Sequence, residues 1–206
     1  IDASGLELRM LAHYLNDKDY TNEILNGDIH TTNQRLARIE SRNQAKTFIY
    51  ALLYGAGDAK LGSVVGGSRT VGKGLRQRFF DNLPSFKQLT DRVQREAKSG
   101  FVKALDGRRL TVRSEHAALN SLLQGAGAIV MKKALIILDE KIAKHGYDAK
   151  FVANVHDEWQ IECHVDDAVS VGKLGVQAIK EAGCMLNLNC PLDGDYKVGS
   201  NWSETH

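Results

Sequence analysis

The chain has 206 residues, of which 43% are hydrophobic and 25% charged, and these proportions are typical of a folded globular protein. A chain of this length forms one large domain or two small ones. No apolar run approaches the roughly 20 residues that a membrane span needs. The N-terminus also lacks the basic and apolar regions of a secretory signal. We therefore expect no membrane partner.

The net charge of +2 hides an uneven distribution of charge along the chain. Residues 42–113 contain 15 Lys and Arg against 5 Asp and Glu, whereas acids are in excess elsewhere. A basic region this long indicates that a polyanion binds on one side of the molecule. A solvated helical face is the alternative interpretation.

The cysteines indicate the redox environment of the chain. Cys163, Cys184 and Cys190 are odd in number and have no CxxC spacing. This pattern favours reduced thiols in an intracellular protein over a disulfide framework or a zinc site.

The first predicted elements are helices. Apolar residues at helical spacing predict helices over residues 6–14, 28–39 and 42–54. The third helix is followed by Gly55, and glycine suits the left-handed conformation that commonly ends a helix.

Residues 62–74 are rich in glycine and are predicted to be mostly loop. Within them, residues 67–74 nearly match the phosphate-binding pattern GxxxxGK[ST]. Gly74 stands at the last position, where a hydroxyl group is required to bind magnesium. We therefore interpret this stretch as a flexible basic loop.

The middle of the chain is predicted to continue with helices and one hairpin. Residues 75–98 have a helical pattern, with Pro84 marking a break or a first turn. Residues 101–112 predict a hairpin that turns at an Asp-Gly pair. Residues 117–145 form a long apolar pattern that predicts one extended helix.

The last part of the chain predicts a pair of strands and a helix. Apolar runs at 151–155 and 159–163 are separated by a short polar turn, and a helical pattern follows over 166–185. Residues 186–206 are expected to be irregular or extended. Many helices with strands confined to hairpins indicate the α+β class with a small antiparallel sheet.

Adjacent carboxylates stand at this turn, in the sequence His156–Asp157–Glu158. Neighbouring like charges raise each other's pKa, and a bound cation relieves their repulsion. Another carboxylate, Asp2, lies near the other end of the chain. Carboxylates on adjacent strands can bridge two divalent cations, and hard oxygen ligands favour magnesium. A turn or N-cap aspartate is the alternative interpretation for each acid.

A basic and aromatic face is predicted on the helix at 42–54. Arg42, Lys46, Tyr50 and Tyr54 follow one another at four-residue spacing, which keeps the first three on one side. Two cations followed by an aromatic ring can clamp a triphosphate with its base stacked beyond. The alternative is an amphipathic helix whose aromatic residues face the core.

Polar residues also interrupt the long apolar helix. Asn120 and Gln124 lie one turn apart, and Arg113 lies just upstream. Amide groups there could reach minor-groove acceptors, which are similar for every base pair. A hydrogen bond between helices is the alternative interpretation.

Four segments of the chain have the order and the spacing of motifs in one known family. They are DASGLELR at residues 2–9, RNQAKTFIYALLYG at 42–55, the segment 113–127, and VHDE at 155–158. These segments resemble the motifs of the C-terminal part of family A (polymerase I-like) DNA polymerases. The chain most resembles the replicative polymerases of short-tailed bacteriophages, including in its ending, GSNW followed by His206.

The resemblance implies that Asp2, Asp157 and the carbonyl group of Ala3 bind two magnesium ions. It implies that Glu158 assists near the primer end. The residues that would hold the triphosphate are His30, Arg42 and Lys46. Lys46 would also be placed to protonate the leaving pyrophosphate.

The resemblance assigns further roles around the nucleotide and the DNA. Tyr50 implies tolerance of dideoxynucleotides, and Glu7 packed against it would crowd a ribose 2′-hydroxyl group. Tyr54 would stack near the templating base. The residues that would contact the primer–template are Arg113, Asn120, Gln124 and His156.

The implied fold is a polymerase palm, formed by residues 1–20 and 101–206, with a mostly helical fingers subdomain at 21–100. The resemblance leads us to expect no thumb and no exonuclease domain within these 206 residues. The implied activity is addition of deoxynucleotides to a primer 3′ end by two-metal phosphoryl transfer. The expected partners are primer–template DNA, deoxynucleoside triphosphates and the missing thumb-bearing portion, in the cytoplasm of a host cell.

Two alternative functions are open at this point. The chain could be a non-catalytic DNA-binding and assembly piece that needs a second polypeptide carrying the thumb. A two-metal nuclease or other phosphoesterase is the other alternative, but it leaves the face formed by Arg42, Lys46 and Tyr50 without a role. Because only Ile1 precedes Asp2, we expect the chain to be a fragment or a separately made piece.

Overall fold

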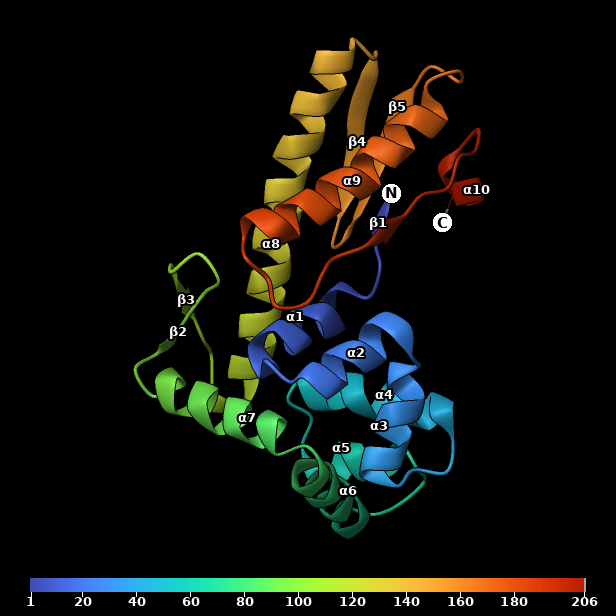
Figure 1. Cartoon of the computed structure of the whole chain (residues 1–206). Coiled ribbons are helices and arrows are strands. Elements are labelled where there is room, and N and C mark those ends of the chain that lie inside the picture. Colours follow the sequence, from blue (N-terminus) through green and yellow to red (C-terminus); the bar gives the residue numbers. More distant parts are fainter. Residues whose placement is uncertain (206) are drawn as a thin grey trace. The chain divides into compact units, whose positions relative to one another are not determined.

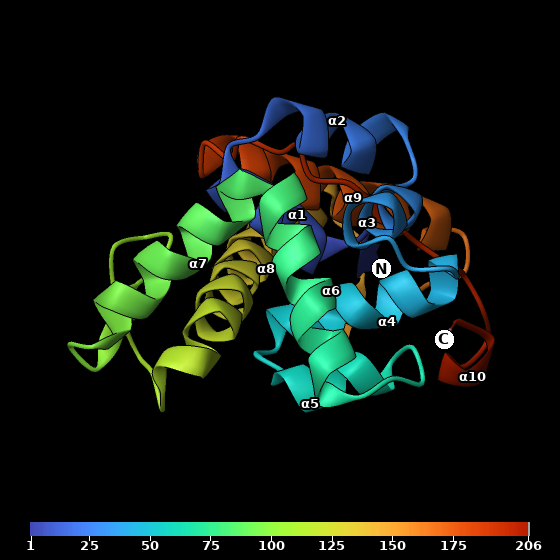
Figure 2. The same cartoon turned by 90° about the horizontal axis from the view of Figure 1, so that it is seen from below.

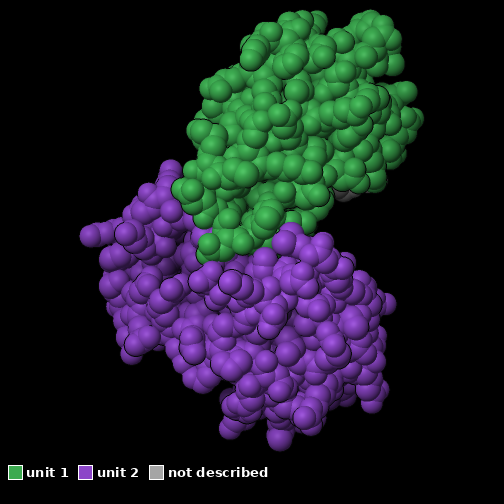
Figure 3. All heavy atoms as spheres, in the orientation of Figure 1, with its two compact units in different colours: residues 1–10, 126–206 green, residues 11–125 purple. Residues whose placement is uncertain are grey.

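The computed structural model describes residues 1–205 and consists mainly of helices, with short antiparallel strands (Figure 1). Contacts within the chain divide it into two compact units, residues 1–10 with 126–206 and residues 11–125 (Figure 3). The predicted α+β class is confirmed. The division into palm and fingers segments stays a prediction, and His206 lies outside the described residues.

The unit formed by residues 11–125 is mostly helical. Its elements are α2 (Lys18–Asn26), α3 (Ile29–Ala37), α4 (Arg42–Leu53), α5 (Asp58–Ser63), α6 (Arg69–Asn82), α7 (Pro84–Ala97), the hairpin strands β2 (Phe101–Lys103) and β3 (Arg109–Thr111), and the 3-10 turn η1 (Glu115–Ala117). Helix α3 packs against α4 and α6, and α5 packs against α6 (Figure 2). The core includes Phe48, Phe79 and Phe86, whose rings meet edge to face with centroids 5.8 and 5.3 Å apart.

The glycine-rich stretch at 62–74 is where the sequence prediction is wrong. Helix α6 begins at Arg69, so six of the eight residues in the near-match to a phosphate loop are helical. A Cβ atom on Gly72 would lie 1.9 Å from the carbonyl oxygen of Asp58, and one on Gly62 would lie 2.0 Å from that of Ser68. These glycines therefore allow α5 and α6 to pack backbone against backbone.

Helix α2 has no counterpart among the predicted elements. The Asp17 side chain caps it by accepting a hydrogen bond from the amide of Tyr20 at 3.1 Å. Only Tyr20 is buried in this helix. Its apolar or aromatic residues are only Tyr20, Ile24 and Leu25, which is too short a pattern to reveal a helix by periodicity.

The other unit contains a four-stranded antiparallel sheet. Its elements are β1 (Asp2–Ala3), β4 (Ala149–Val155), β5 (Glu158–Cys163), α9 (Ala168–Met185), β6 (Gly194–Asp195) and α10 (Trp202–Thr205), and the strand order is β4-β5-β1-β6. Helix α9 packs against β1 and β6. Beyond residue 186 the chain is extended in the edge strand β6, as predicted, whereas the helix α10 was not predicted. Two further helices, α1 (Leu6–Leu15) and α8 (Ala118–His145), contribute residues to both units.

The long helical stretch Glu115–His145 qualifies the expectation about membranes. By length and composition it is apolar enough to cross a bilayer, and half of its most apolar window is buried inside the structure. Core helices of soluble proteins satisfy the same criterion, so this single helix is weak support for a membrane span.

Candidate active site

The sheet brings the predicted acidic residues together. Strand β1 lies between β5 and β6, with Asp2 opposite Glu158 on one side and opposite Asp195 on the other. The amide of Ala3 donates a hydrogen bond to the carbonyl oxygen of Asp157 at 3.0 Å. The two sequence motifs that carry these acids are therefore neighbours in one sheet.

The carboxylates in this cluster interact electrostatically. Burial raises the pKa of Asp2, and the negative charges of Asp157 and Glu158 raise it further. Asp195 acts in the same direction but more weakly. Sequence reasoning missed Asp195, because a two-residue strand in an otherwise irregular segment leaves no periodic signal.

The Glu158 carboxylate is held by neighbouring side chains. Gln160, two residues further along β5, donates a hydrogen bond from its amide nitrogen to Glu158 Oε1. The Thr205 hydroxyl group of α10 donates to Gln160 Oε1 at 3.3 Å. Gln160 and Thr205 were not predicted, and they connect the C-terminal helix to the acidic cluster.

The chemistry of the acidic cluster fits magnesium. Carboxylate and carbonyl oxygens are the hard ligands this ion prefers, and Mg²⁺ sites in proteins usually use few carboxylates, with waters or substrate phosphates completing the shell. Burial, and then the negative charges of Asp157 and Glu158, raise the pKa of Asp2, so a bound cation would stabilise its ionised form. Within residues 1–205 no group of three or more His, Cys, Asp or Glu side chains forms a metal cage. The cluster can therefore supply part of a coordination shell.

The predicted triphosphate residues form a second cluster, within residues 11–125. His30 lies in the first turn of α3, and Arg42, Lys46 and Tyr50 follow one another along α4. The His30 and Tyr50 ring centroids are 6.2 Å apart. Burial lowers the pKa of His30, and the positive charges of Arg42 and Lys46 lower it further. His30 Nδ1 is buried and has no hydrogen-bond partner among the described residues, so this nitrogen is available to a ligand.

One arginine of this cluster is already engaged by an acid. Arg42 pairs with Asp28, the N-cap residue of α3. The Arg42 guanidinium beside Asp28 holds the pKa of that carboxyl group well below its usual range. Asp28 is the first residue of the helix predicted over residues 28–39, and it was not assigned a functional role from the sequence.

Helix α4 has a buried face and an exposed face. Its buried residues are Ala45, Phe48, Ile49, Leu52 and Leu53. Lys46 is exposed, Tyr50 is half-buried, and Tyr54 is 52% exposed. The interpretation that both tyrosines face the core is therefore wrong for Tyr54. Glu7 lies in the first turn of α1, in the other unit, and its packing against Tyr50 stays a prediction.

The predicted DNA-contacting residues belong to different units. Arg113 is exposed just before η1, and Asn120 and Gln124 are half-buried one turn apart near the start of α8. His156 is exposed at the turn between β4 and β5, where its φ angle of 54° lies in the left-handed region. Their common role on DNA stays a prediction.

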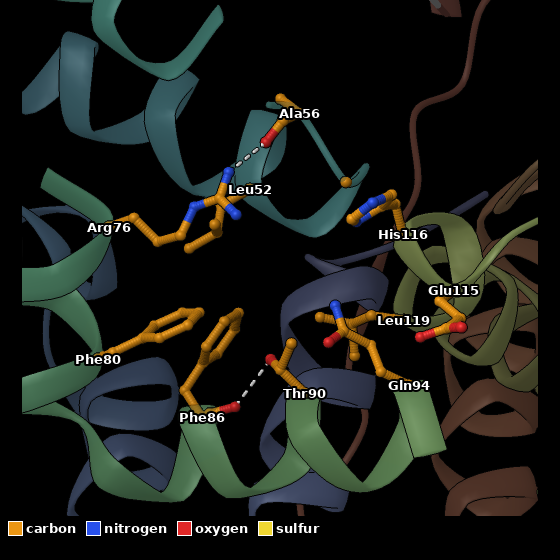
Figure 4. Close-up of a pocket in the computed structure, with 11 residues that line it drawn as sticks. Leu52, Ala56, Arg76, Phe80, Phe86, Thr90, Gln94, Glu115, His116 and Leu119 are labelled. Atoms are coloured by element: carbon orange, nitrogen blue, oxygen red, sulfur yellow. Dashed lines mark hydrogen bonds between the residues drawn. The ribbon is translucent and has the colours of Figure 1, made fainter. Parts of the chain in front are cut away.

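A small cavity lies at the C-terminal end of α4, within residues 11–125 (Figure 4). Its volume of about 40 Å³ is enough for a few water molecules but too small for a nucleobase. Arg76 lines it, donating a hydrogen bond to the carbonyl oxygen of Ala56 at 2.8 Å and pairing with Asp58 at 3.0 Å. Sequence reasoning did not predict this cavity, because its lining residues come from four separate stretches of the chain.

Comparison with known families identifies the class of protein. The profile of DNA polymerase family A matches residues 1–204. The chain therefore belongs to DNA polymerase family A, and the resemblance inferred from its motifs is confirmed.

Individual relatives come from bacteriophages and bacteria. The DNA-directed DNA polymerases of Enterobacteria phage T3 and Escherichia phage T7 are each 43% identical over 231 residues, which cover 100% of this chain and 33% of each relative. The DNA polymerase I of Aquifex aeolicus is 34% identical, covering 98% of this chain and 38% of that protein. The chain thus spans about a third of the phage polymerases it matches.

A solved structure has the same fold. The polymerase domain of Pol1 from M. smegmatis, in a complex with DNA primer–template and dNTP, superposes with a TM-score of 0.87. The match covers 99% of this chain and 39% of that chain at 24% sequence identity. The chain therefore has the fold of part of a polymerase domain.

Proposed function

We propose that this chain is the palm-and-fingers part of a template-directed DNA polymerase. It would add deoxynucleotides to a primer 3′ end, in the cytoplasm of a host cell if the gene is carried by a phage. The observation that carries the proposal is the meeting of Asp2 and Asp157 on adjacent segments of one sheet, in a chain of DNA polymerase family A.

The acidic cluster would bind the metal ions of the phosphoryl-transfer reaction. Asp2, Asp157 and the carbonyl group of Ala3 are the residues that would hold two magnesium ions, which stabilise negative charge on attacking and leaving oxygens when bound. The Glu158 carboxylate, fixed by Gln160, would accept hydrogen bonds near the primer end. A carboxylate already held by a neighbour loses less freedom when it binds.

The basic cluster would bind the incoming nucleotide. His30, Arg42 and Lys46 would hold the triphosphate, and Lys46 would donate a proton to the leaving pyrophosphate. Tyr50 would lie beside the sugar and base, where Glu7 would exclude a ribose 2′-hydroxyl group. The support for this arrangement is the shared electrostatic environment of His30, Arg42 and Lys46.

Primer–template DNA and a thumb-bearing portion of the polymerase are the other proposed partners. Arg113, Asn120, Gln124 and His156 would contact the primer–template, with Tyr54 near the templating base. The phage relatives are about three times as long as this chain, which favours a second portion that carries the thumb. This coverage also favours the alternative that the chain assembles with that portion before it is active.

The proposal is tested by primer extension with the purified chain, alone and mixed with the N-terminal remainder of the polymerase. Asp157→Ala should reduce incorporation by at least about 100-fold while circular dichroism shows an unchanged fold, because a metal ligand is lost and no core is removed. Asp148→Ala is the matched control, since this exposed aspartate in the same unit pairs only loosely with Lys150, at 3.7 Å. It should leave extension unchanged.

The outcomes separate the candidate functions. A folded Asp157→Ala chain with normal extension would end the assignment of the acidic cluster. Extension by the isolated chain would rule out the assembly-only alternative, whereas extension only after mixing would support it. Degradation of DNA without nucleotides, abolished by Asp157→Ala, would indicate a nuclease instead.

A further inference from the structure

Asp28 is the N-cap residue of α3, and its side chain contacts Arg42 at the start of α4. Its carboxylate accepts a hydrogen bond from the amide of His30 at 3.1 Å and another from the Thr31 hydroxyl group at 2.7 Å. These bonds cap α3 and fix the carboxylate at the start of that helix. Asp28 is therefore a rigid acceptor and not a mobile surface acid.

The same carboxylate binds Arg42 through one edge of its guanidinium group. Arg42 Nε donates to Asp28 Oδ2 at 2.5 Å, and Arg42 Nη2 donates to Asp28 Oδ1 at 2.9 Å. A two-point contact of this kind fixes the plane of the guanidinium as well as its position. The group has five N–H donors, so three remain for another acceptor.

The exposure of the pair indicates that this acceptor comes from outside the chain. The Arg42 and Asp28 side chains are 49% and 41% exposed. Lys46 lies one turn further along α4, and its positive charge acts on the same His30 imidazole as that of Arg42. Arg42 and Lys46 are therefore exposed one turn apart near the start of α4, and His30 lies in the first turn of α3.

We infer that Asp28 is a positioning residue, which orients the Arg42 guanidinium so that its remaining N–H groups face the triphosphate of an incoming nucleotide. The inference rests on the proposed function and adds to it a residue that does not touch the nucleotide. Because α3 anchors Asp28, the carboxylate stays in place when the nucleotide binds. It does not act as a phosphate mimic that must leave.

The chain offers a matched control for this role. Asp17 caps α2 in the same unit, as Asp28 caps α3, by accepting from a backbone amide at 3.1 Å. Its other oxygen accepts from the Ser85 hydroxyl group at 2.9 Å. Asparagine is as good an N-cap as aspartate, so Asp28→Asn and Asp17→Asn should both keep their helices.

The experiment measures binding of a deoxynucleoside triphosphate with Mg²⁺ to the full chain by calorimetry. Asp28→Asn should raise the dissociation constant about threefold to tenfold, since an exposed, two-point ion pair makes a modest contribution to pre-organisation. Asp17→Asn should leave it unchanged. In an Arg42→Lys background Asp28→Asn should have no effect, because lysine cannot form the two-point contact.

A second measurement follows the geometry without nucleotide. The Arg42 Nε–H signal in nuclear magnetic resonance should exchange slowly with solvent in the wild-type chain and rapidly in Asp28→Asn.

Unchanged nucleotide binding by Asp28→Asn would overturn the positioning role alone, and tighter binding would show that the carboxylate competes with phosphate. A loss of equal size in the Arg42→Lys background would assign the effect to the helix. Absence of nucleotide binding in every chain, including the wild type, would instead refute the proposed function on which the inference rests.

Discussion

Gly55, which follows α4, allows this helix to end directly against the turn before α8. Its φ angle is +76°, and a Cβ atom at this position would lie 2.3 Å from the carbonyl oxygen of His116. Both residues belong to the unit formed by residues 11–125. Gly55→Ala therefore combines a strained backbone with a clash against another backbone segment.

The magnitude follows from these two effects. A left-handed conformation costs an alanine about 1–2 kcal/mol. Forcing extra volume into a packed contact costs about 1–3 kcal/mol. We therefore expect Gly55→Ala to lower the free energy of unfolding by about 2–5 kcal/mol.

Two nearby glycines separate the contributions. Gly66 has a φ of +71° and Gly57 an ordinary φ of −71°, and nothing lies within 4 Å of a Cβ atom on either. Gly66→Ala should lose only about 1–2 kcal/mol, and Gly57→Ala, at the N-cap of α5, about 0.5–1 kcal/mol. The assay is urea unfolding followed by far-UV circular dichroism, because both tryptophans, Trp159 and Trp202, lie in the other unit. Equal losses for Gly55→Ala and Gly66→Ala would refute the contact with His116.

Three further substitutions test the helical unit. Tyr20→Phe removes the hydroxyl group that donates to buried Asn33 Oδ1 at 3.1 Å, and should cost about 1–3 kcal/mol in urea unfolding; no loss would show that the bond is not formed. Tyr50→Phe should raise discrimination against dideoxynucleotides, and unchanged chain-termination ratios would contradict the proposed role of this ring. Lys46→Ala should weaken nucleotide use far more than binding to duplex DNA, so equal losses in both assays would make it a general DNA contact.

Much of the fold follows from periodicity in the sequence. Long apolar patterns predicted four elements, and each begins and ends within two residues of the predicted bounds. These elements are the helices α4 and α8 and the strands β4 and β5. Pro84 starts α7 as expected for proline in the first turn. The position of Asp2 beside β5 could be predicted only through the family resemblance, because no local pattern links residues so far apart.

The missed features lack such patterns for physical reasons. Helix α2 buries one residue, so its stability comes from a cap and tertiary contacts and not from an apolar stripe. The glycines at 62 and 72 were interpreted as flexible, but close packing of α5 and α6 requires the absence of a side chain. Asp195 joins the acidic cluster only through the pairing of β6 with β1.

The short strand β1 has a consequence for how the molecule folds. The amide of Trp159 donates a hydrogen bond to the carbonyl oxygen of Ile1, although 158 residues separate them. Closing so long a loop is entropically costly, and contacts between distant segments slow folding. Residues 11–125, by contrast, are continuous in sequence and can form helices from local contacts. We therefore expect the helices of residues 11–125, including α4, to form before β1 pairs with β5 and completes the acidic cluster.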